Sequence, residues 1–269
     1  MQRRKLLAMA APAIVVPAWF RFGEPHWFEL TRRRVKLGVR RRLVLHVSDL
    51  HTSDGLTAED LEAGLEMGLR QRPDLICFTG DFVTTTRGYD RVGLERLLRR
   101  AADTAATYAV LGNHDGGAWL GRRGGSASPR EIADLVEGAG IRLLRNEWVV
   151  DGDLTLVGVE DYWSGELDGE RAFGGAPEGV ARVLLSHNPD AKGELVEQGW
   201  DLMLSGHTHG GQARLPGWTP PWAPVADKRY VEGLHEWGGR QLFVTRGMGS
   251  PKHVRAFCRP EVSILEFGA

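Results

Sequence analysis

Residues 43–51 read LVLHVSDLH, a short apolar run with β-branched valines that passes directly into the polar residues Asp49 and His51. A run of this kind predicts a buried strand followed by a polar loop. The pattern recurs at residues 75–81 (LICFTGD) and 108–115 (YAVLGNHD), and helical patterns separate the three copies. Strands that alternate with helices are typical of an α/β domain with parallel strands.

Three helices are predicted between and after these strands. Thr57 begins the first, with Asp60 three residues later as a capping-box partner. The second covers residues 93–102, and Ser128-Pro129 opens the third as N-cap and first turn. Further strands are predicted at residues 148–150, 154–159, 183–186, 202–205, 242–245 and 262–266. No repeat or interior linker divides these elements, so we predict one α/β domain with two sheets packed as a sandwich and helices outside.

The composition is that of a folded protein. With 269 residues, 42% of them hydrophobic and 26% charged, the chain is long enough to bury a large core, which excludes a disordered protein. Its two cysteines, Cys77 and Cys258, are too few for a disulfide scaffold or a cysteine-based zinc finger. We therefore predict two buried thiols.

The net charge of −1 is the sum of two opposite parts. Residues 1–42 hold 11 of the 34 Lys and Arg residues and 2 of the 35 Asp and Glu residues, a charge of +9, which leaves −10 on residues 43–269. Nucleic acids bind clustered Lys and Arg, so the acidic body disfavours nucleic acid as a partner. The basic part indicates a membrane surface or an export machinery as a partner instead.

The N-terminal residues are typical of a targeting segment. Arg3, Arg4 and Lys5 precede an apolar run at residues 6–20, which is shorter than the roughly 20 residues that a membrane-spanning helix needs. The run and the paired arginines resemble a twin-arginine export signal, with Val16-Pro17-Ala18 as a candidate cleavage site. The alternatives are an uncleaved membrane anchor and a buried N-terminal helix.

This interpretation divides the chain into three parts. We predict a signal or membrane anchor at residues 1–20, a basic juxtamembrane segment at residues 21–42 and a single domain at residues 43–269. The arginines of the second part would resist translocation by the positive-inside rule. The body is therefore expected to be membrane-associated or exported, with the side of the membrane left open.

Five of the nine histidines follow predicted strands: His51, His114, His187, His207 and His209. Loops at the carboxyl ends of strands converge in open α/β sheets, so we expect these side chains to meet at one site. A single histidine of this kind is more often structural. Five of them in one chain favour a site built for a ligand.

Oxygen ligands stand in the same loops as these histidines. Asp49 and Asp81 supply carboxylates, and Asn113 supplies a neutral amide oxygen. Such a mixture of nitrogen and oxygen donors without thiolates suits Mn, Fe or Zn better than Ca. The sequence therefore predicts a transition-metal site at the strand ends.

The motifs around these residues resemble those of the calcineurin-like metallophosphoesterases. They are, in chain order, Ser48-Asp49-Leu50-His51, Gly80-Asp81, Gly112-Asn113-His114-Asp115, Ser186-His187 and Gly206-His207-Thr208-His209-Gly210-Gly211-Gln212. The resemblance covers residues 43–212. It implies a four-layer α/β/β/α sandwich of two mixed sheets.

The resemblance also implies a site for two divalent metal ions, Mn, Fe or Zn. Asp49, His51 and His209 would bind one ion, Asn113, His187 and His207 would bind the other, and Asp81 would bridge them. In such a site, a hydroxide that bridges the ions attacks the phosphorus atom. The surplus positive charge would attract an anionic phosphoester despite the acidic body.

Several residues outside the metal ligands have expected roles with stated alternatives. His114 is expected to donate a proton or to stabilise the transition state, oriented by Asp115, although Asp115 is alternatively a loop-capping carboxylate. Arg246 either reaches the phosphate of the substrate or anchors the last strands. Four tryptophans either form a rim for an acyl chain or a bilayer, or pack structurally: Trp119, Trp163, Trp218 and Trp222.

One bacterial branch of the family matches the wider chain. Glu24-Pro25-His26, Gly210-Gly211-Gln212 and Thr245-Arg246-Gly247-Met248-Gly249 resemble exported or membrane-attached phosphoesterases, among them a UDP-2,3-diacylglucosamine pyrophosphatase. The protein Ser/Thr phosphatase branch fits less well, because it would carry Glu at the position of Asp115. It would also carry Asp-Arg-Gly where this chain has Asp81-Phe82-Val83.

We therefore expect a monomeric phosphodiesterase or pyrophosphatase at the bacterial cell envelope. Its substrate would be UDP-2,3-diacylglucosamine or another lipid or nucleotide phosphoester. The alternatives are a nuclease of the same superfamily and a non-catalytic metal-binding protein of the envelope.

Overall fold

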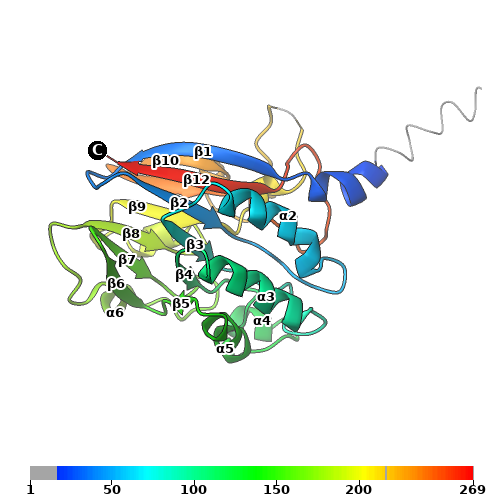
Figure 1. Ribbon diagram of the computed structural model, residues 1–269, viewed down its shortest axis with the longest axis horizontal. Coiled ribbons are helices and arrows are strands. Elements are labelled where there is room, and N and C mark those ends of the chain that lie inside the picture. The colour runs from blue at the N-terminus through cyan, green and yellow to red at the C-terminus, as the bar shows by residue number, and fades with distance from the viewer. Residues whose placement is uncertain (1–16, 216, 269) are drawn as a thin grey trace, which may run out of the picture.

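The computed structural model describes residues 17–215 and 217–268, and its strands form two six-stranded sheets (Figure 1). The first has the order β1 (Glu29–Lys36), β12 (Glu261–Gly268), β2 (Arg42–Val47), β3 (Leu75–Thr79), β4 (Ala106–Val110) and β5 (Arg142–Leu143). The second has the order β10 (Gly233–Trp237), β11 (Arg240–Val244), β9 (Leu202–Ser205), β8 (Ala181–Leu185), β7 (Leu154–Gly158) and β6 (Glu147–Asp151). Both sheets are mixed, because β12 runs antiparallel to β2, and β10 and β6 run antiparallel to their neighbours.

Helices cover the outer faces of both sheets. The first sheet carries α2 (Ala58–Leu69), α3 (Arg91–Ala102) and α5 (Arg130–Gly138), and the second carries α6 (Gly169–Phe173) and α7 (Ala191–Glu194). Shorter turns complete the described chain: η1 (Trp19–Gly23), η2 (Glu24–His26), α4 (Ala118–Gly121), η3 (His209–Gly211) and η4 (Lys228–Tyr230).

Alternation along the strands builds three apolar layers. In β2, Leu45 packs into the core below α2, α3 and α5, while Val44 points into the core between the sheets. In β7, Leu156 likewise joins the core between the sheets and Val157 joins the core below α6 and α7. Because side chains of a strand alternate between faces, each sheet buries both of its faces. The predicted four-layer α/β/β/α sandwich is confirmed.

The predicted helices are present, and two of them have shifted starts: α3 begins at Arg91 instead of residue 93, and α5 begins after Pro129. At α2, Thr57 accepts a hydrogen bond from the backbone of Asp60 and the Asp60 side chain accepts one from the backbone of Thr57, as the capping box requires. At α5, the helix begins at Arg130, and Pro129 occupies the N-cap instead of Ser128. Besides the edge strand β1, two further edge strands were not predicted, β5 and β10, because the first has two residues and the second contains His235 and Glu236.

The predicted domain start at residue 43 is too late, because β1 lies within the segment assigned to the juxtamembrane region. β1 pairs in parallel with β12 over its full length. Val35 is buried in the core, whereas Arg32, Arg33 and Arg34 are exposed on the edge strand. Arg32 also forms an ion pair with Glu266 on β12 at 2.6 Å. The three arginines obscured a strand whose alternate residues are apolar.

The predictions for the N-terminal targeting segment fall mostly outside the described residues. The paired arginines and residues 6–16 of the apolar run lie outside the described residues. The last two residues of the run, Trp19 and Phe20, lie in η1. Within residues 17–215 and 217–268, no helix combines the length and the apolar character needed to cross a membrane.

Candidate metal centre

The predicted site residues follow strands whose carboxyl ends lie at the same edge of the sandwich. β2, β3 and β4 are parallel in the first sheet, and β8 and β9 are parallel in the second. Loops after these strands therefore converge. They bring together all seven predicted metal ligands, all of them buried: Asp49, His51, Asp81, Asn113, His187, His207 and His209.

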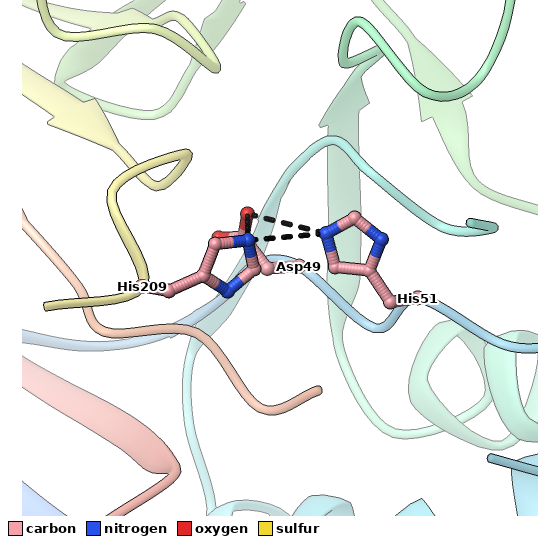
Figure 2. A group of neighbouring side chains, drawn as sticks. All are labelled: Asp49, His51 and His209. Carbon is pink, nitrogen blue, oxygen red and sulfur yellow. Dashed lines mark hydrogen bonds and ion pairs between the residues drawn. The ribbon is translucent and has the colours of Figure 1, made fainter. Parts of the chain in front are cut away.

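One cluster of ligand atoms contains Asp49, His51 and His209, which face one another in Figure 2. The Nε2 atoms of His51 and His209 lie 3.2 Å apart. Asp49 Oδ1 lies 3.5 Å from the Nε2 atom of His209 and 3.9 Å from that of His51. Imidazole nitrogens and a carboxylate oxygen thus point at a common centre.

A second cluster contains Asp81, His187 and His207. Asp81 Oδ2 lies 3.2 Å from His187 Nε2, and His187 Nε2 lies 3.1 Å from His207 Nδ1. His187 Nδ1 donates a hydrogen bond to the carbonyl oxygen of Thr79 at 2.7 Å, which turns its Nε2 atom toward Asp81.

Asp81 connects the two clusters. The same oxygen that faces His187, Oδ2, lies 3.3 Å from His51 Nε2. Asn113 lies next to His114, whose backbone N–H donates to the other oxygen of Asp81 at 2.9 Å. Within the described part of the chain, the buried Oδ1 atom of Asn113 has no hydrogen-bond donor. An acceptor oxygen that is buried without a donor is suited to a cation.

The backbone is strained at these same residues. Positive φ angles, which are uncommon outside glycine, occur at five of the seven ligands: Asp49 (56°), His51 (50°), Asp81 (56°), His207 (69°) and His209 (52°). Such conformations are unfavourable by about 1–3 kcal/mol each and cluster at functional sites. The fold therefore holds these side chains in place against local preference.

A sequence model of the calcineurin-like phosphoesterases matches residues 42–211, which span all of these loops. The chain belongs to this family. It is a hydrolase that acts on phosphoester bonds, and the described residues supply candidate metal-binding clusters at the family's site.

Relatives of this calcineurin-like phosphoesterase align with nearly the whole chain. It is 37% identical to the phosphodiesterase YaeI of Escherichia coli (strain K12), over 98% of each protein. It is 30% identical to the uncharacterised metallophosphoesterase YkuE of Bacillus subtilis, over 98% of this chain and 97% of that one. It is 26% identical to the UDP-2,3-diacylglucosamine pyrophosphatase LpxG of Chlamydia muridarum, over 97% and 95%.

Burial and charge set the protonation of the phosphoesterase site. Burial lowers the pKa of His51 to about 4 and lowers the pKa values of His207 and His209 well below their ordinary value. Burial alone would also lower the pKa of His187, but the charges of Asp81, Asp49 and Asp161, together with the hydrogen bond to Asp81, outweigh burial and raise that pKa to about 10. Neutral imidazole is the form that binds metals, so a metal ion at the second cluster would displace the Nε2 proton of His187 and take over the balancing of the buried carboxylates.

Asp115 does not orient His114, contrary to prediction. Its carboxylate accepts hydrogen bonds from the backbone N–H groups of Asp81, Phe82 and Gly112, each at 2.8 Å, and so ties the loop after β3 to the loop after β4. The Nδ1 atom of His114 donates to the carbonyl oxygen of Thr84 at 2.6 Å instead. The alternative of a loop-capping carboxylate therefore describes Asp115.

Arg246 is held by carboxylates outside the two clusters. Its guanidinium lies 2.7 Å from Glu29, and 3.6 Å from both Glu232 and Glu261. These glutamates begin β1, precede β10 and begin β12. Of the two roles considered, the structure supports the anchoring of the last strands.

Tryptophans line the hollow above the clusters. Trp119 stacks with Trp163 at 5.9 Å between ring centroids, and Trp163 meets the His207 ring edge-on at 4.3 Å. Trp222 and His114 line the same hollow, which has a volume of about 250 Å³. Three of the four tryptophans considered for a rim thus lie at the site.

Two polar residues near the site were not predicted. Asp161 follows β7, is buried beside the clusters, and has its pKa raised by burial to about 6. The same strand-end rule that selected Asp49 and Asp81 would have selected it. Arg255 stands in an irregular segment among other basic residues, where nothing in the sequence indicates burial.

Gly206 supports the position of Asp49, and Gly206→Ala is expected to lower turnover about 100-fold with little loss of stability. A Cβ atom at residue 206 would lie 2.0 Å from Ser48 Oγ and 2.2 Å from Asp49 Oδ2, so the carboxylate would have to move. Kinetics and thermal melting measure the two effects. Gly193→Ala, whose Cβ would meet nothing within 4 Å, is the control. Equal turnover in both variants would contradict the prediction.

Arg255 braces the loops of the site from beneath, and Arg255→Ala is expected to lower the free energy of unfolding by about 3–5 kcal/mol. Its fully buried guanidinium donates to the carbonyl oxygens of His209 (3.0 Å), Arg246 (2.8 Å) and Gly249 (2.5 Å). The substitution removes the side-chain donor of the Arg246 and Gly249 oxygens, whereas the His209 oxygen keeps the backbone N–H of Gln212 at 2.9 Å. Chemical denaturation tests this, with the exposed Arg130→Ala as a control; similar stability of the two variants would refute the bracing role.

Proposed function

We propose that this protein hydrolyses phosphodiester or pyrophosphate bonds with two divalent metal ions held at the two clusters. The observation that carries the proposal is the position of Asp81 Oδ2, 3.3 Å from His51 Nε2 in one cluster and 3.2 Å from His187 Nε2 in the other. One carboxylate shared by two sets of donors is what a pair of neighbouring ions requires.

The spacing of the donor atoms supports this assignment. Bonds of about 2.0–2.2 Å to a metal place adjacent ligands about 3.0–3.5 Å apart in tetrahedral or octahedral geometry. Five donor-atom contacts of 3.1–3.5 Å fall in that range, and the contact from Asp49 Oδ1 to His51 Nε2, at 3.9 Å, is longer. The donors are imidazole nitrogens and carboxylate or amide oxygens, which suits Mn, Fe or Zn. When bound, two such ions make a water molecule acidic and neutralise the charge on the phosphoryl oxygens.

The residues around the clusters would handle the substrate. The hydrogen bond from His114 Nδ1 to Thr84 directs the opposite edge of the ring away from that loop, and the ring lines the hollow that the substrate would enter. From there His114 would give a proton to the leaving oxygen. Trp119 packs against the His114 ring at 4.7 Å, which fixes its orientation and limits the access of water.

The names of the relatives and the sequence support a proposal for the substrate class. One relative bears the name of a phosphodiesterase and another that of a UDP-2,3-diacylglucosamine pyrophosphatase. We propose a lipid-linked or nucleotide phosphoester as the substrate, with UDP-2,3-diacylglucosamine as the first candidate. We also propose that residues 1–20 export the protein or attach it to the membrane of a bacterial envelope.

Purified full-length protein, loaded in turn with Mn, Fe or Zn, tests the proposal. It is expected to hydrolyse bis-p-nitrophenyl phosphate and to release UMP from UDP-2,3-diacylglucosamine. Metal chelation should remove both activities, and readdition of metal should restore them. If the protein hydrolyses neither of the two substrates, the proposal is overturned. Nucleic acid is tested as a third substrate over a range of salt concentrations. Faster cleavage of nucleic acid than of the other two substrates would favour the nuclease alternative.

A further inference from the structure

Exposed apolar side chains gather at one end of the molecule. Ten large apolar side chains are exposed among the described residues, and seven of them form what we term the aromatic end: Trp19, Phe22, Trp27, Leu215, Trp218, Trp222 and Phe257. They come from η1 and the residues after η2, from the segment after η3 and from residue 257. Single exposed apolar residues need no explanation, but a cluster marks a contact surface.

The aromatic end is continuous. Within its N-terminal part, the rings of Trp19 and Trp27 lie 5.9 Å apart, and the ring of Phe20 in η1 joins this part to the loop at Phe257 with a contact of 5.2 Å. The backbone N–H of Arg255 also donates to the carbonyl oxygen of Phe20 at 3.0 Å, so η1 and the loop before Phe257 lie side by side (Figure 1). A cavity of about 650 Å³ opens between these parts.

The segment after η3, which contains Trp218 and Trp222, extends the surface toward the two clusters of donor side chains. Trp218 and Phe257 line a hollow next to the cavity, and Trp218 meets Trp222 at 5.6 Å. Trp222 Nε1 donates to the carbonyl oxygen of Gly211 at 2.9 Å, two residues from His209, and its ring lines the hollow above the clusters. The surface therefore runs from η1 to the mouth of the candidate active site.

Arginines accompany the aromatic side chains. The Arg259 guanidinium lies 3.9 Å from the centroid of the Trp27 ring, and that of Arg21 lies 5.1 Å from the Phe22 ring. Arg214 lines both the cavity and the hollow beside it. Aromatic rings bordered by arginines are typical of surfaces at the interface between water and lipid, where the rings enter the acyl boundary and the cations meet headgroups.

The preceding sequence indicates the same occupant. Residue 17 enters η1 directly at the aromatic end, and the residues before it include an apolar stretch at 6–16 and three basic residues at 3–5. Apolar residues flanked by basic ones favour an anionic membrane. The sequence that leads into the aromatic end thus has the same apolar and basic character as its surface.

We propose that the aromatic end docks on a bilayer with anionic headgroups. The hollow above the two clusters of donor side chains then opens at the membrane surface. This inference rests on the proposed function, because docking would serve the hydrolysis of a lipid-linked substrate. Trp222 connects the two, since it belongs to the aromatic end and lines the hollow above the clusters. A phosphoester whose lipid part stays in the bilayer then reaches the clusters along the aromatic end.

A fluorescent probe attached to full-length protein tests the docking surface. Cys77 and Cys258 are buried, so an exposed cysteine in Trp218→Cys can be labelled with a polarity-sensitive dye. Val92→Cys provides the matched control, since Val92 is 76% exposed on α3 and lies outside the aromatic end. With phosphatidylcholine–phosphatidylglycerol vesicles, we expect the emission at residue 218 to rise and shift to the blue, and that at residue 92 to stay unchanged.

Charge substitutions measure the strength of docking. Phe22 is 70% exposed and Trp218 is 50% exposed, so Phe22→Glu and Trp218→Glu leave the core intact. Each is expected to weaken vesicle binding about tenfold, because one large apolar side chain no longer leaves water. Val92→Glu should bind as the unsubstituted protein does.

Two outcomes would overturn the proposal. One is an unchanged emission at residue 218 while the protein sediments with vesicles, since the N-terminal segment alone would then hold it. The other is a shift without vesicles that depends on protein concentration, which would identify a second copy as the occupant. Hydrolysis of the water-soluble bis-p-nitrophenyl phosphate is measured separately. If neither this substrate nor UDP-2,3-diacylglucosamine is hydrolysed, the proposed function is refuted, and the vesicle measurements still test docking independently.

Discussion

Asp81→Asn is expected to lower phosphodiesterase turnover by at least about 1,000-fold and to reduce the bound metal. The substitution keeps the shape of the side chain and removes its charge. Asp81 is the residue that both clusters share, with one oxygen 3.3 Å from His51 Nε2 and 3.2 Å from His187 Nε2. Without that charge, two adjacent cations would repel each other across a neutral amide.

Metal analysis and kinetics with bis-p-nitrophenyl phosphate measure these effects on the same preparation. Asp134→Asn is the matched control, because the Asp134 side chain is 62% exposed on α5, where it makes only a 3.7 Å pair with Arg130. Thermal melting shows whether the Asp81 variant is folded. A folded Asp81→Asn protein that keeps its metal and its turnover would contradict the shared role of this carboxylate.

His114→Ala is expected to lower turnover by about 100-fold to 10,000-fold on a substrate with a poor leaving group, with metal content unchanged. We expect this loss because a poor leaving oxygen needs the proton that His114 would supply. Nitrophenolate is a good leaving group, so the loss on bis-p-nitrophenyl phosphate should be much smaller. The ratio of the two losses therefore measures proton donation directly.

The His114 experiment also separates a proton donor from a metal ligand. The ligand atoms of His51, Asp81 and His114 lie within 4.8 Å of one another, so coordination by His114 is geometrically open. If His114→Ala loses metal, and loses activity equally on both substrates, His114 is a ligand and the proposed role is wrong. Asp134→Asn, on the exposed face of α5, serves again as the control.

Much of the fold was predictable because its signals are local. β2 and β3 are apolar runs that end in polar residues, and α2 has a capping box at Thr57, so each element is specified by residues close together in sequence. The ligand residues were recognisable for the same reason. Aspartate and histidine directly after buried strands have few structural reasons to be there, and parallel strands bring their loops to one edge.

The residues that were misassigned depend on distant partners. β1 is a strand because Val35 enters the core and Arg32 pairs with Glu266, more than 200 positions away. Arg246 is an anchor because three glutamates from separate elements surround it. In the sequence, all of these arginines look alike, since charge alone does not state whether a side chain is exposed.

The sequence by itself determined most of the strands and helices, the donor types at the strand ends and the kind of metal they suit, because these depend on residue type and short spacings. The tertiary structure decided how those residues act together. Asp115 caps a loop, Arg255 supports the His209 loop, and Trp222 joins the site to the aromatic end. Such roles arise from burial and from contacts between distant segments, which only the packed molecule defines.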